Sequence, residues 1–202
     1  MKQKELEIIL QKVPEFEKPS SKLEQYLTPA GTAANIIFTA YQFGDIKDKV
    51  VFDLGCGTGI FAIGAILTGA KRVIGFDIDK KSIKIAKKYA ENNKLNVEFI
   101  VKDVLDIKEK CDTIIMNPPF GAQKSNLKAD RKFIEKGFNI SSVIYSIHLK
   151  KTIPFIEKMI LSLKGEITFY KNYIFPLKHT YNFHEKRAVD YEVSLLRILT
   201  KR

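Results

Sequence analysis

Apolar runs and amphipathic stretches alternate along most of the chain. Short runs rich in Val, Ile and Phe, such as residues 49–54, have the length and composition of buried strands, whereas residues 80–92 carry apolar side chains at helical spacing. Strands that alternate with helices predict a mainly parallel sheet covered by helices on both faces. The predicted strands are 49–54, 71–77, 96–102, 111–116, 141–147, 165–175 and 188–200, and the predicted helices between them are 59–68, 80–92, 130–139 and 150–163.

The two ends of the chain depart from this alternation. The last two predicted strands follow one another without a helix, which predicts an antiparallel pair at one edge of a seven-stranded α/β sheet. Ahead of the first strand, residues 3–11 and about 29–43 are predicted to be helical, with Thr28 capping the second helix and Pro29 opening it. We expect one domain over residues 1–202, in which residues 1–45 form a helical segment ahead of the core.

The charge balance indicates a partner. The chain has 34 Lys and Arg against 23 Asp and Glu, a formal net charge of +11, which favours a polyanion such as nucleic acid or an anionic membrane surface. Cys56 and Cys111 lie far apart with no nearby His, so neither a metal site nor a disulfide framework is predicted. No stretch has the length of a membrane span or the apolar core of a signal peptide, which predicts a cytoplasmic protein without a membrane partner.

The first predicted strand runs into a glycine-rich turn at Gly55, Gly57 and Gly59, and a helix follows. Glycines at such a place let a ligand approach the backbone and leave amide groups free at the start of the helix. The next strand ends on Asp77, whose carboxylate can hold two ribose hydroxyls. The third strand closes near Asp103, which can accept a hydrogen bond from the amine of an adenine. Three strand ends in this order predict a nucleoside site.

The same turn argues against two common nucleotide sites. A phosphate-binding loop has Lys and then Ser or Thr after its glycines, whereas Ile60 and Phe61 follow Gly59. A dinucleotide fingerprint reads Gly-x-Gly-x-x-Gly, whereas this turn reads Gly-x-Gly-x-Gly. A nucleoside cofactor without phosphates fits better, so the sequence favours S-adenosylmethionine over NAD.

A second chemical motif, Asn117-Pro118-Pro119-Phe120, ends the fourth predicted strand. The prolines stop the strand and hold a backbone carbonyl rigidly beside the amide oxygen of Asn117, while Phe120 offers a flat apolar face. Two acceptors and a stacking surface suit a planar substrate that carries an amino group. The alternative for these residues alone is a strand-to-loop turn stiffened by proline.

With both motifs in place, the sequence resembles the Rossmann-like class I methyltransferases, and Asn117-Pro118-Pro119-Phe120 matches their amino-group subclass. It further resembles the methyltransferase-like protein five family, which methylates adenine N6 in small-subunit ribosomal RNA. The stretches that carry this resemblance are Leu23-Glu24-Gln25-Tyr26, Asp53-Leu54-Gly55-Cys56-Gly57, Gly75-Phe76-Asp77-Ile78-Asp79, Ile115 to Gly121, Val143 to His148 and Phe183 to Asp190.

The resemblance implies roles for individual residues. Gln25 and Thr28 are expected to form a lid over the cofactor. The methionine side of the cofactor is expected at Gly55, Thr58 and Ile60, its ribose at Asp77, and its adenine at Asp103 and Val104. Thr58 stands where relatives often have another small side chain, which leaves the expected backbone contact unchanged.

Two basic stretches are candidates for RNA contact. The segment 122–132 contains Lys124, Lys128, Arg131 and Lys132, and the connection between the last two strands contains Phe183, His184, Lys186 and Arg187. Aromatic side chains interleaved with positive charge are typical of surfaces that bind nucleic acid. The alternative for each is a solvated basic loop.

Other functions remain open at this stage. The same motif occurs in enzymes that methylate a glutamine amide of a protein or guanine N2 of rRNA, and a non-catalytic RNA-binding module is a remoter alternative. The resembling family also binds a small zinc-containing activator by strand addition. We expect that partner at the edge of the third strand, at Val97 and Phe99, unless neighbouring loops or a second copy of the chain cover this edge.

Overall fold

The computed structural model describes residues 1–17, 19–120, 129–177 and 189–200. Its centre is a sheet whose strands lie within a few residues of the predicted ranges. They are β1 Val50–Leu54, β2 Arg72–Asp77, β3 Glu98–Val101, β4 Thr113–Met116, β5 Val143–Leu149, β6 Glu166–Leu177 and β7 Val189–Leu199.

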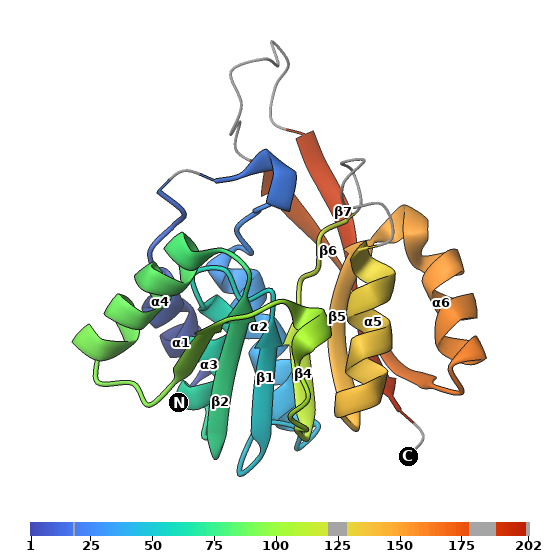
Figure 1. The fold of residues 1–202 in the computed structure, drawn as a ribbon, viewed down its shortest axis with the longest axis horizontal. Helices are drawn as coiled ribbons and strands as arrows, with labels where there is room; N and C mark the ends of the chain where they lie inside the picture. The colour runs from blue at the N-terminus through green and yellow to red at the C-terminus, as the bar shows by residue number, and fades with distance from the viewer. Residues whose placement is uncertain (18, 121–128, 178–188, 201–202) are drawn as a thin grey trace.

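The strand order across the sheet is β3-β2-β1-β4-β5-β7-β6 (Figure 1). Strands β3, β2, β1, β4 and β5 run parallel, whereas β7 is antiparallel to both β5 and β6. The predicted fold class, a mainly parallel seven-stranded sheet with an antiparallel pair at one edge, is therefore confirmed. The carboxyl ends of the five parallel strands share one edge, where polar side chains from different strands can meet.

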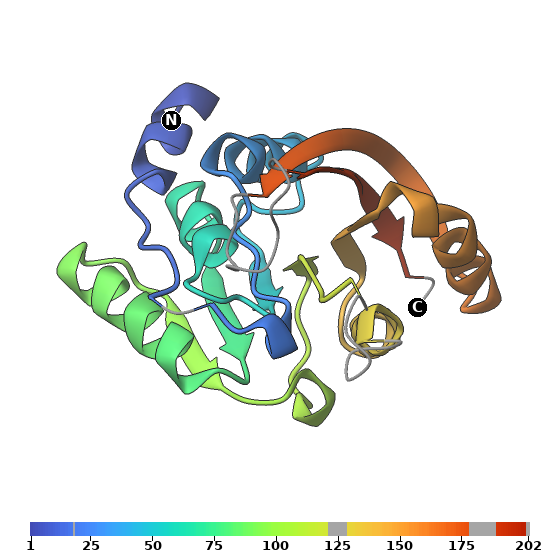
Figure 2. The same ribbon diagram turned by 90° about the horizontal axis from the view of Figure 1, so that it is seen from above.

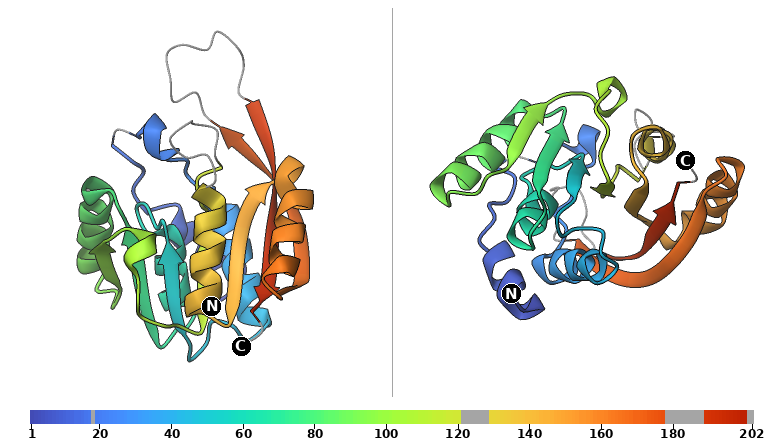
Figure 3. Two further views of the ribbon diagram at one scale, coloured as in Figure 1. Left: turned by 45° about the vertical axis from the view of Figure 1, so that its right-hand side comes forward. Right: turned by 90° about the horizontal axis from the view of Figure 1, so that it is seen from below.

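Helices cover both faces of this sheet, as Figures 2 and 3 show. Buried residues alternate along the strands, so that Val51 and Ile115 belong to one core and Phe52 and Ile114 to the other. The first core packs against α2, α3 and α4, the second against α5 and α6, and α1 packs on α2 and α3. The helices are α1 Gln3–Leu10, α2 Ala30–Gln42, α3 Ile60–Leu67, α4 Lys80–Asn92, α5 Ala129–Ile140 and α6 Ile153–Ser162, with short 3₁₀ turns at Ser21–Leu23, Val104–Asp106 and Lys150–Thr152.

The segment between α1 and α2 crosses over the carboxyl-terminal edge of the sheet, at the top of Figure 1. The cap at the start of α2, where this segment ends, differs from the prediction. Pro29 occupies the N-cap position and no side chain caps this helix, so the predicted capping role of Thr28 is wrong. The Thr28 hydroxyl instead accepts a hydrogen bond from Asn117, because the fold brings the end of β4 beside the start of α2.

Strand β3 lies at the edge of the sheet, as predicted. Phe99 and Val97, however, do not form its exposed edge as expected. Phe99 is only 3% exposed and belongs to the core, where its ring lies against Gly59 and Gly75. Val97 precedes the strand, and its N–H donates to the carbonyl of Leu95. The exposed apolar side chain of this edge is Val101. Within the described ranges, none of the helices combines the length and apolar character needed to cross a membrane.

Candidate active site

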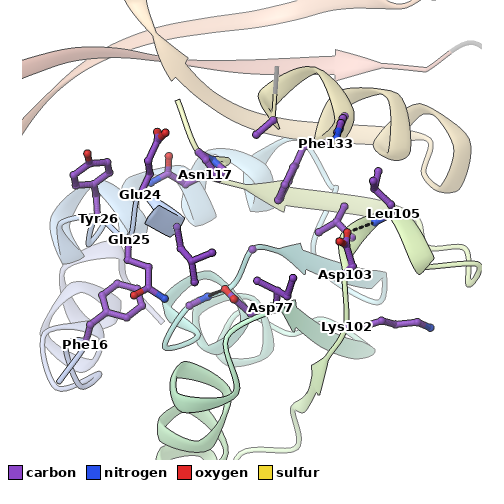
Figure 4. A pocket seen from close by; sticks show the side chains of 18 residues that line it. Phe16, Glu24, Gln25, Tyr26, Asp77, Lys102, Asp103, Leu105, Asn117 and Phe133 are labelled. Carbon is purple, nitrogen blue, oxygen red and sulfur yellow. Dashed lines mark hydrogen bonds between the residues drawn. The ribbon is translucent and has the colours of Figure 1, made fainter. Parts of the chain in front are cut away.

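A cavity of about 270 Å³ lies between the segment that precedes α2 and the carboxyl ends of the parallel strands (Figure 4). Its walls come from that segment, from the turns after β1, β2 and β3, from the end of β4 and from the first turns of α5. In Figure 4, Asp103, Leu105 and Lys102 lie at one end, Asp77 near the middle, and Asn117 with Tyr26 at the other. One cavity thus joins the two motifs that the sequence singled out.

The glycine turn after β1 has a close-packed geometry that side chains would prevent. Gly57 has φ of 54° and Gly59 of 94°, values in the left-handed region that favours glycine. A Cβ on Gly57 would lie 2.8 Å from the Phe16 ring, and one on Gly59 would lie 2.6 Å from the Phe99 ring. The turn therefore keeps Gly55 and Gly57 in the cavity wall with their backbone accessible.

Asp77, the last residue of β2, holds this turn against the neighbouring strand. Its Oδ2 accepts a hydrogen bond from Gly57 N and its Oδ1 one from Asp79 N, both at 2.8 Å. Burial raises the pKa of Asp77 above its ordinary value despite these hydrogen bonds. A carboxylate has about four acceptor positions, so Asp77 can still accept hydrogen bonds from donors in the cavity. The hydroxyls of a ribose supply two donors, and their hydrogen bonds would offset the cost of burying the charge.

Asp103 and the residues after β3 form the far end of the cavity. The Oδ1 of Asp103 accepts from Leu105 N at 2.9 Å, which fixes the carboxylate at the start of the short 3₁₀ turn. Ile78 and Leu105 line the same end and remain 56% and 46% exposed. Two apolar side chains beside a carboxylate suit a flat base that bears an amino group.

Gln25 connects the crossing segment to the first turn of α4. Its Nε2 donates to Asp79 Oδ2 at 2.9 Å, while its Oε1 accepts from Ser20 N at 2.8 Å. Burial alone would raise the pKa of Asp79, but hydrogen bonds from Ser82 and Gln25 outweigh it and lower that pKa. Gln25 lines the cavity and also fastens the segment above it, while its lid role over a cofactor stays a prediction.

Asn117 lies at the opposite end, directly after β4. Its Nδ2 donates to Thr28 Oγ1 at 3.1 Å, which orients the amide. Its Oδ1 is buried and has no hydrogen-bond partner among the residues that the structure describes. A buried acceptor without a donor costs about 1–3 kcal/mol, so this oxygen is poised for a donor from outside the described residues.

Two aromatic rings flank the Asn117 end. The Phe120 and Tyr26 rings are nearly parallel, at 14°, with centroids 6.4 Å apart. Pro119 and Tyr26 line the cavity, and Phe120 packs against the first core.

Asp53, at the end of β1, is fully buried beneath the turn. Its Oδ2 accepts from Ala62 N at 2.9 Å, which ties β1 to the first turn of α3. Burial raises the pKa of Asp53 to about 8, since the one backbone hydrogen bond compensates only part of the desolvation and the Asp77 charge adds to it.

Only some of the remaining predicted site residues line the cavity. Val104 lines the cavity, whereas Thr58 and Ile60 are not among the described residues that do so. Arg131 lies with its guanidinium 4.0 Å from the centroid of the Phe155 ring, and Lys132 lines the cavity. Six of the predicted RNA-binding residues lie outside the described ranges, namely Lys124, Lys128, Phe183, His184, Lys186 and Arg187.

Three aromatic residues of the cavity were missed as site residues. Phe16 and Phe133 close over Gly57 and Gly55, and Tyr26 faces Phe120. Their position depends on contacts between distant parts of the chain, which no local pattern indicates. Tyr26 did lie in one of the stretches that carried the family resemblance.

Comparisons with known proteins agree with this geometry. Residues 33–140 match the methyltransferase small domain family. The chain is 38% identical to the rRNA N(6)-adenosine-methyltransferase METTL5 of Danio rerio, with 98% of each chain covered, and 33% identical to Mettl5 of Drosophila melanogaster, covering 98% of this chain and 96% of that one. The crystal structure of PH1948 from Pyrococcus horikoshii, a proposed RNA methyltransferase, superimposes with a TM-score of 0.91 at 36% identity and covers 100% of this chain and 99% of the other. The chain therefore belongs to the methyltransferase small domain family and, within it, to the family of the METTL5 rRNA N(6)-adenosine-methyltransferases.

Proposed function

We propose that the protein transfers a methyl group from S-adenosylmethionine to the N6 amine of an adenosine in RNA, with small-subunit rRNA as the substrate. The observation that carries this proposal is the buried Oδ1 of Asn117, which lacks a partner among the described residues and lies in the same cavity as Asp77 and Asp103. An rRNA substrate also agrees with the basic excess of the chain and with the predicted cytoplasmic location.

The cofactor end of the cavity fits S-adenosylmethionine, which supplies an electrophilic methyl group when it is bound. Asp77 can still accept hydrogen bonds from ribose hydroxyls beside those it receives from Gly57 N and Asp79 N. Asp103 and Val104, with Ile78 and Leu105 beside them, form the adenine end. Gly55 and the Gln25 lid would hold the methionine side.

At the other end, Asn117 and the Pro118 carbonyl would each accept one N–H of the target amine. The lone pair of an adenine amine is delocalised into the ring, so the amine needs orientation more than a strong base. Two acceptors pull the nitrogen towards tetrahedral geometry and turn its lone pair towards the methyl donor. Phe120 would stack on the base, a contact worth roughly 1–3 kcal/mol. Because Pro119 cannot rotate freely, it keeps Pro118 and Phe120 in place.

RNA would be held by the two basic stretches that the sequence singles out. We assign this role to Lys124, Lys128, Arg131 and Lys132 and to the connection with Phe183, His184, Lys186 and Arg187. A base that is paired in RNA must leave its helix to reach such a cavity, so the target is unpaired or flipped out.

Labelled S-adenosylmethionine tests the proposed function. Small-subunit RNA from cells that lack the protein is incubated with the enzyme, digested to nucleosides and separated. Label in N6-methyladenosine is expected for the wild type and not for Asn117→Ala. Label in N2-methylguanosine or in protein glutamine instead would show that the substrate is not an RNA adenosine. Absence of cofactor binding in calorimetry would favour a non-catalytic RNA-binding module.

We further propose that a small zinc-containing activator adds a strand to the edge of β3. Support comes from the position of β3, which has one strand neighbour in the described sheet, and from the exposed Val101. Lys102 N donates to the Asp77 carbonyl, so the N–H of Val101, pointing the opposite way, faces the free edge.

Val101→Pro removes that outward N–H and leaves the hydrogen bond from Lys102 N to Asp77 O in place, while the matched variant Val101→Ala keeps the N–H. Co-purification with the activator is expected to be lost for Val101→Pro and retained for Val101→Ala. Equal recovery of the activator with both variants would place the partner elsewhere. This pair is a better probe than substitution of Phe99 or Val97, because those residues serve the core and a local turn.

A further inference from the structure

Two arginines lie on aromatic rings, and they differ in what else their side chains bind. The guanidinium of Arg131, in the first turn of α5, lies 4.0 Å from the centroid of the Phe155 ring in α6. The guanidinium of Arg197, in β7, lies 4.5 Å from the centroid of the Phe43 ring, which follows α2. Arg197 also donates two hydrogen bonds to Asp45, at 2.8 and 3.2 Å. The second contact is therefore part of a largely buried ion pair.

Arg131 has no such partner among the residues that the structure describes. Within that part of the chain its guanidinium donates no hydrogen bond and forms no ion pair, and the neighbouring Asp130 accepts from the backbone N–H of Arg131 instead. Arg131 is partly exposed and Phe155 is 42% exposed, so the contact lies at the surface. A ring covers the face of a guanidinium and leaves its N–H edge open. The five donors of that edge are therefore available to an acceptor from outside the described residues.

The place of this contact is next to the cavity. Helices α5 and α6 both begin at the carboxyl-terminal edge of the sheet, where Figure 3 shows them side by side, and Lys132, the residue after Arg131, lines the cavity. The starts of the two helices, residues 129–132 and 150–155, contain four basic side chains, one of them paired with Glu192, against one acidic side chain. Positive charge thus exceeds negative charge here, as a surface that binds an anion requires.

We propose that Phe155 is a positioning residue, which holds the Arg131 guanidinium so that its N–H edge binds a phosphate of the RNA strand beside the target nucleotide. This inference rests on the proposed function and adds to it a ligand for Arg131 and a role for Phe155. A guanidinium and a phosphate match in two parallel N–H···O bonds, a contact that depends on orientation as the attraction of a lysine ammonium does not. A guanidinium already held on a ring loses less freedom when RNA binds, which favours the complex.

Variants of Arg131 separate its charge from its shape. Affinity of the full chain for the small-subunit RNA described above is measured by filter binding over a range of salt concentrations. Arg131→Gln removes the charge, so it is expected to weaken binding and to lower the slope of log affinity against log salt by about 0.7–0.9, the contribution of one phosphate. Arg131→Lys keeps the charge and the slope but is expected to bind about 10-fold more weakly, because one of two hydrogen bonds to a charged group is lost. Wild-type affinity of Arg131→Lys would overturn the proposal.

A double-mutant cycle tests Phe155. Phe155→Leu is expected to weaken RNA binding by about 2- to 5-fold in the wild-type background and to have no further effect in Arg131→Gln, because the ring acts through the guanidinium. Phe155→Tyr keeps the ring and is expected to bind RNA as the wild type does. The matched control is Phe43→Leu, which removes the ring under Arg197, is similarly exposed at 44%, and is expected to leave RNA affinity unchanged.

Other outcomes of the cycle would contradict the positioning role. An equal loss from Phe155→Leu with and without the Arg131 side chain would mean that the ring contacts RNA itself. A loss of the same size in Phe43→Leu would mean that the effect reflects general destabilisation. Failure of the proposed function is distinguishable from failure of this inference: label in N2-methylguanosine contradicts the first, label in protein glutamine alone contradicts both, and wild-type RNA affinity of Arg131→Lys contradicts the second alone.

Discussion

The two ends of the cavity are built on different principles. At the cofactor end, Gly57, Asp77 and Asp103 lie at or just after the carboxyl ends of adjacent strands, and short backbone hydrogen bonds hold them. At the acceptor end, Asn117 and Phe120 depend on Thr28 and Tyr26, which come from the segment ahead of the sheet. The turns of the sheet build the first end, and Phe16 and Gln25 of the crossing segment only cover it, whereas the second end takes Thr28 and Tyr26 from that segment. Binding of the cofactor and positioning of the substrate are thus separable by mutation.

The largest expected effect is that of Asn117→Ala. Removal of the side chain takes away one of the two acceptors for the target amine and leaves every group of the cofactor end unchanged. Because misplacement of a reacting group costs about 100-fold or more, kcat is expected to fall by at least that factor. S-adenosylmethionine affinity, measured by calorimetry, is expected to stay within about twofold. An affinity loss as large as the loss of activity would contradict the separation of the two ends.

Asp77→Ala is the reciprocal test. Hydrogen bonds to a charged group contribute about 1.5–3 kcal/mol each, so loss of the ribose contacts is expected to weaken cofactor binding by about 10- to 100-fold or more. Raising the cofactor concentration should then restore much of the methylation rate, which it cannot do for Asn117→Ala. Unchanged affinity would show that the ribose lies elsewhere.

The affinity of the wild type for the cofactor should also decrease as the pH is lowered. Ribose hydroxyls donate to the ionised form of Asp77, and burial has raised the pKa of that carboxyl. Protonation as the pH falls through this raised pKa removes the favourable form and weakens binding. Titrations of cofactor affinity against pH check this, with Asp77→Ala expected to be flat over the same range.

Thr28→Val is expected to have a smaller effect at the acceptor end. It removes the hydroxyl that accepts from Asn117 Nδ2 and keeps a side chain of similar shape. A neutral hydrogen bond contributes about 0.5–1.5 kcal/mol, so kcat is expected to fall by about 2- to 12-fold while cofactor affinity is unchanged. An effect on cofactor affinity instead would return Thr28 to the lid role predicted from the family resemblance.

The difference between the two ends also explains what the sequence could predict. Asp77 and Asp103 follow recognisable strands, and the alternation of strands and helices places their ends along one edge of the sheet. The position of Asn117 was predictable for the same reason. These inferences need only local patterns and the general geometry of parallel sheets.

Predictions failed where a contact between distant residues overrode a local preference. Thr28 precedes a helix and was expected to cap it, yet Asn117 binds its hydroxyl. Phe99 lies on an edge strand and was expected at the surface, yet the missing side chains of Gly59 and Gly75 leave space for its ring in the core. No periodicity in the sequence indicates either contact, and the pairing of Tyr26 with Phe120 was hidden in the same way.

The smallest expected effect is that of Asp53, which lies beneath the glycine turn of the cofactor end, and it is an effect on stability. The pKa of Asp53 is about 8 in the folded protein against an ordinary value of 3.8, so folding favours its protonated form. The contribution of Asp53 to stability is therefore fully present below pH 3.8, declines as the pH rises to about 8, and stays low above it. An asparagine side chain at this position does not ionise, so Asp53→Asn does not lose this stability as the pH rises. The melting temperature of Asp53→Asn relative to that of the wild type is therefore expected to rise between about pH 5 and pH 9. The rise is roughly 2–4 °C for each kcal/mol of stability that the wild type loses. Melting curves across this range test the prediction. A difference in melting temperature between Asp53→Asn and the wild type that is independent of pH would mean that Asp53 is ionised throughout. The carboxylate beneath the turn would then add a negative charge to the cofactor site.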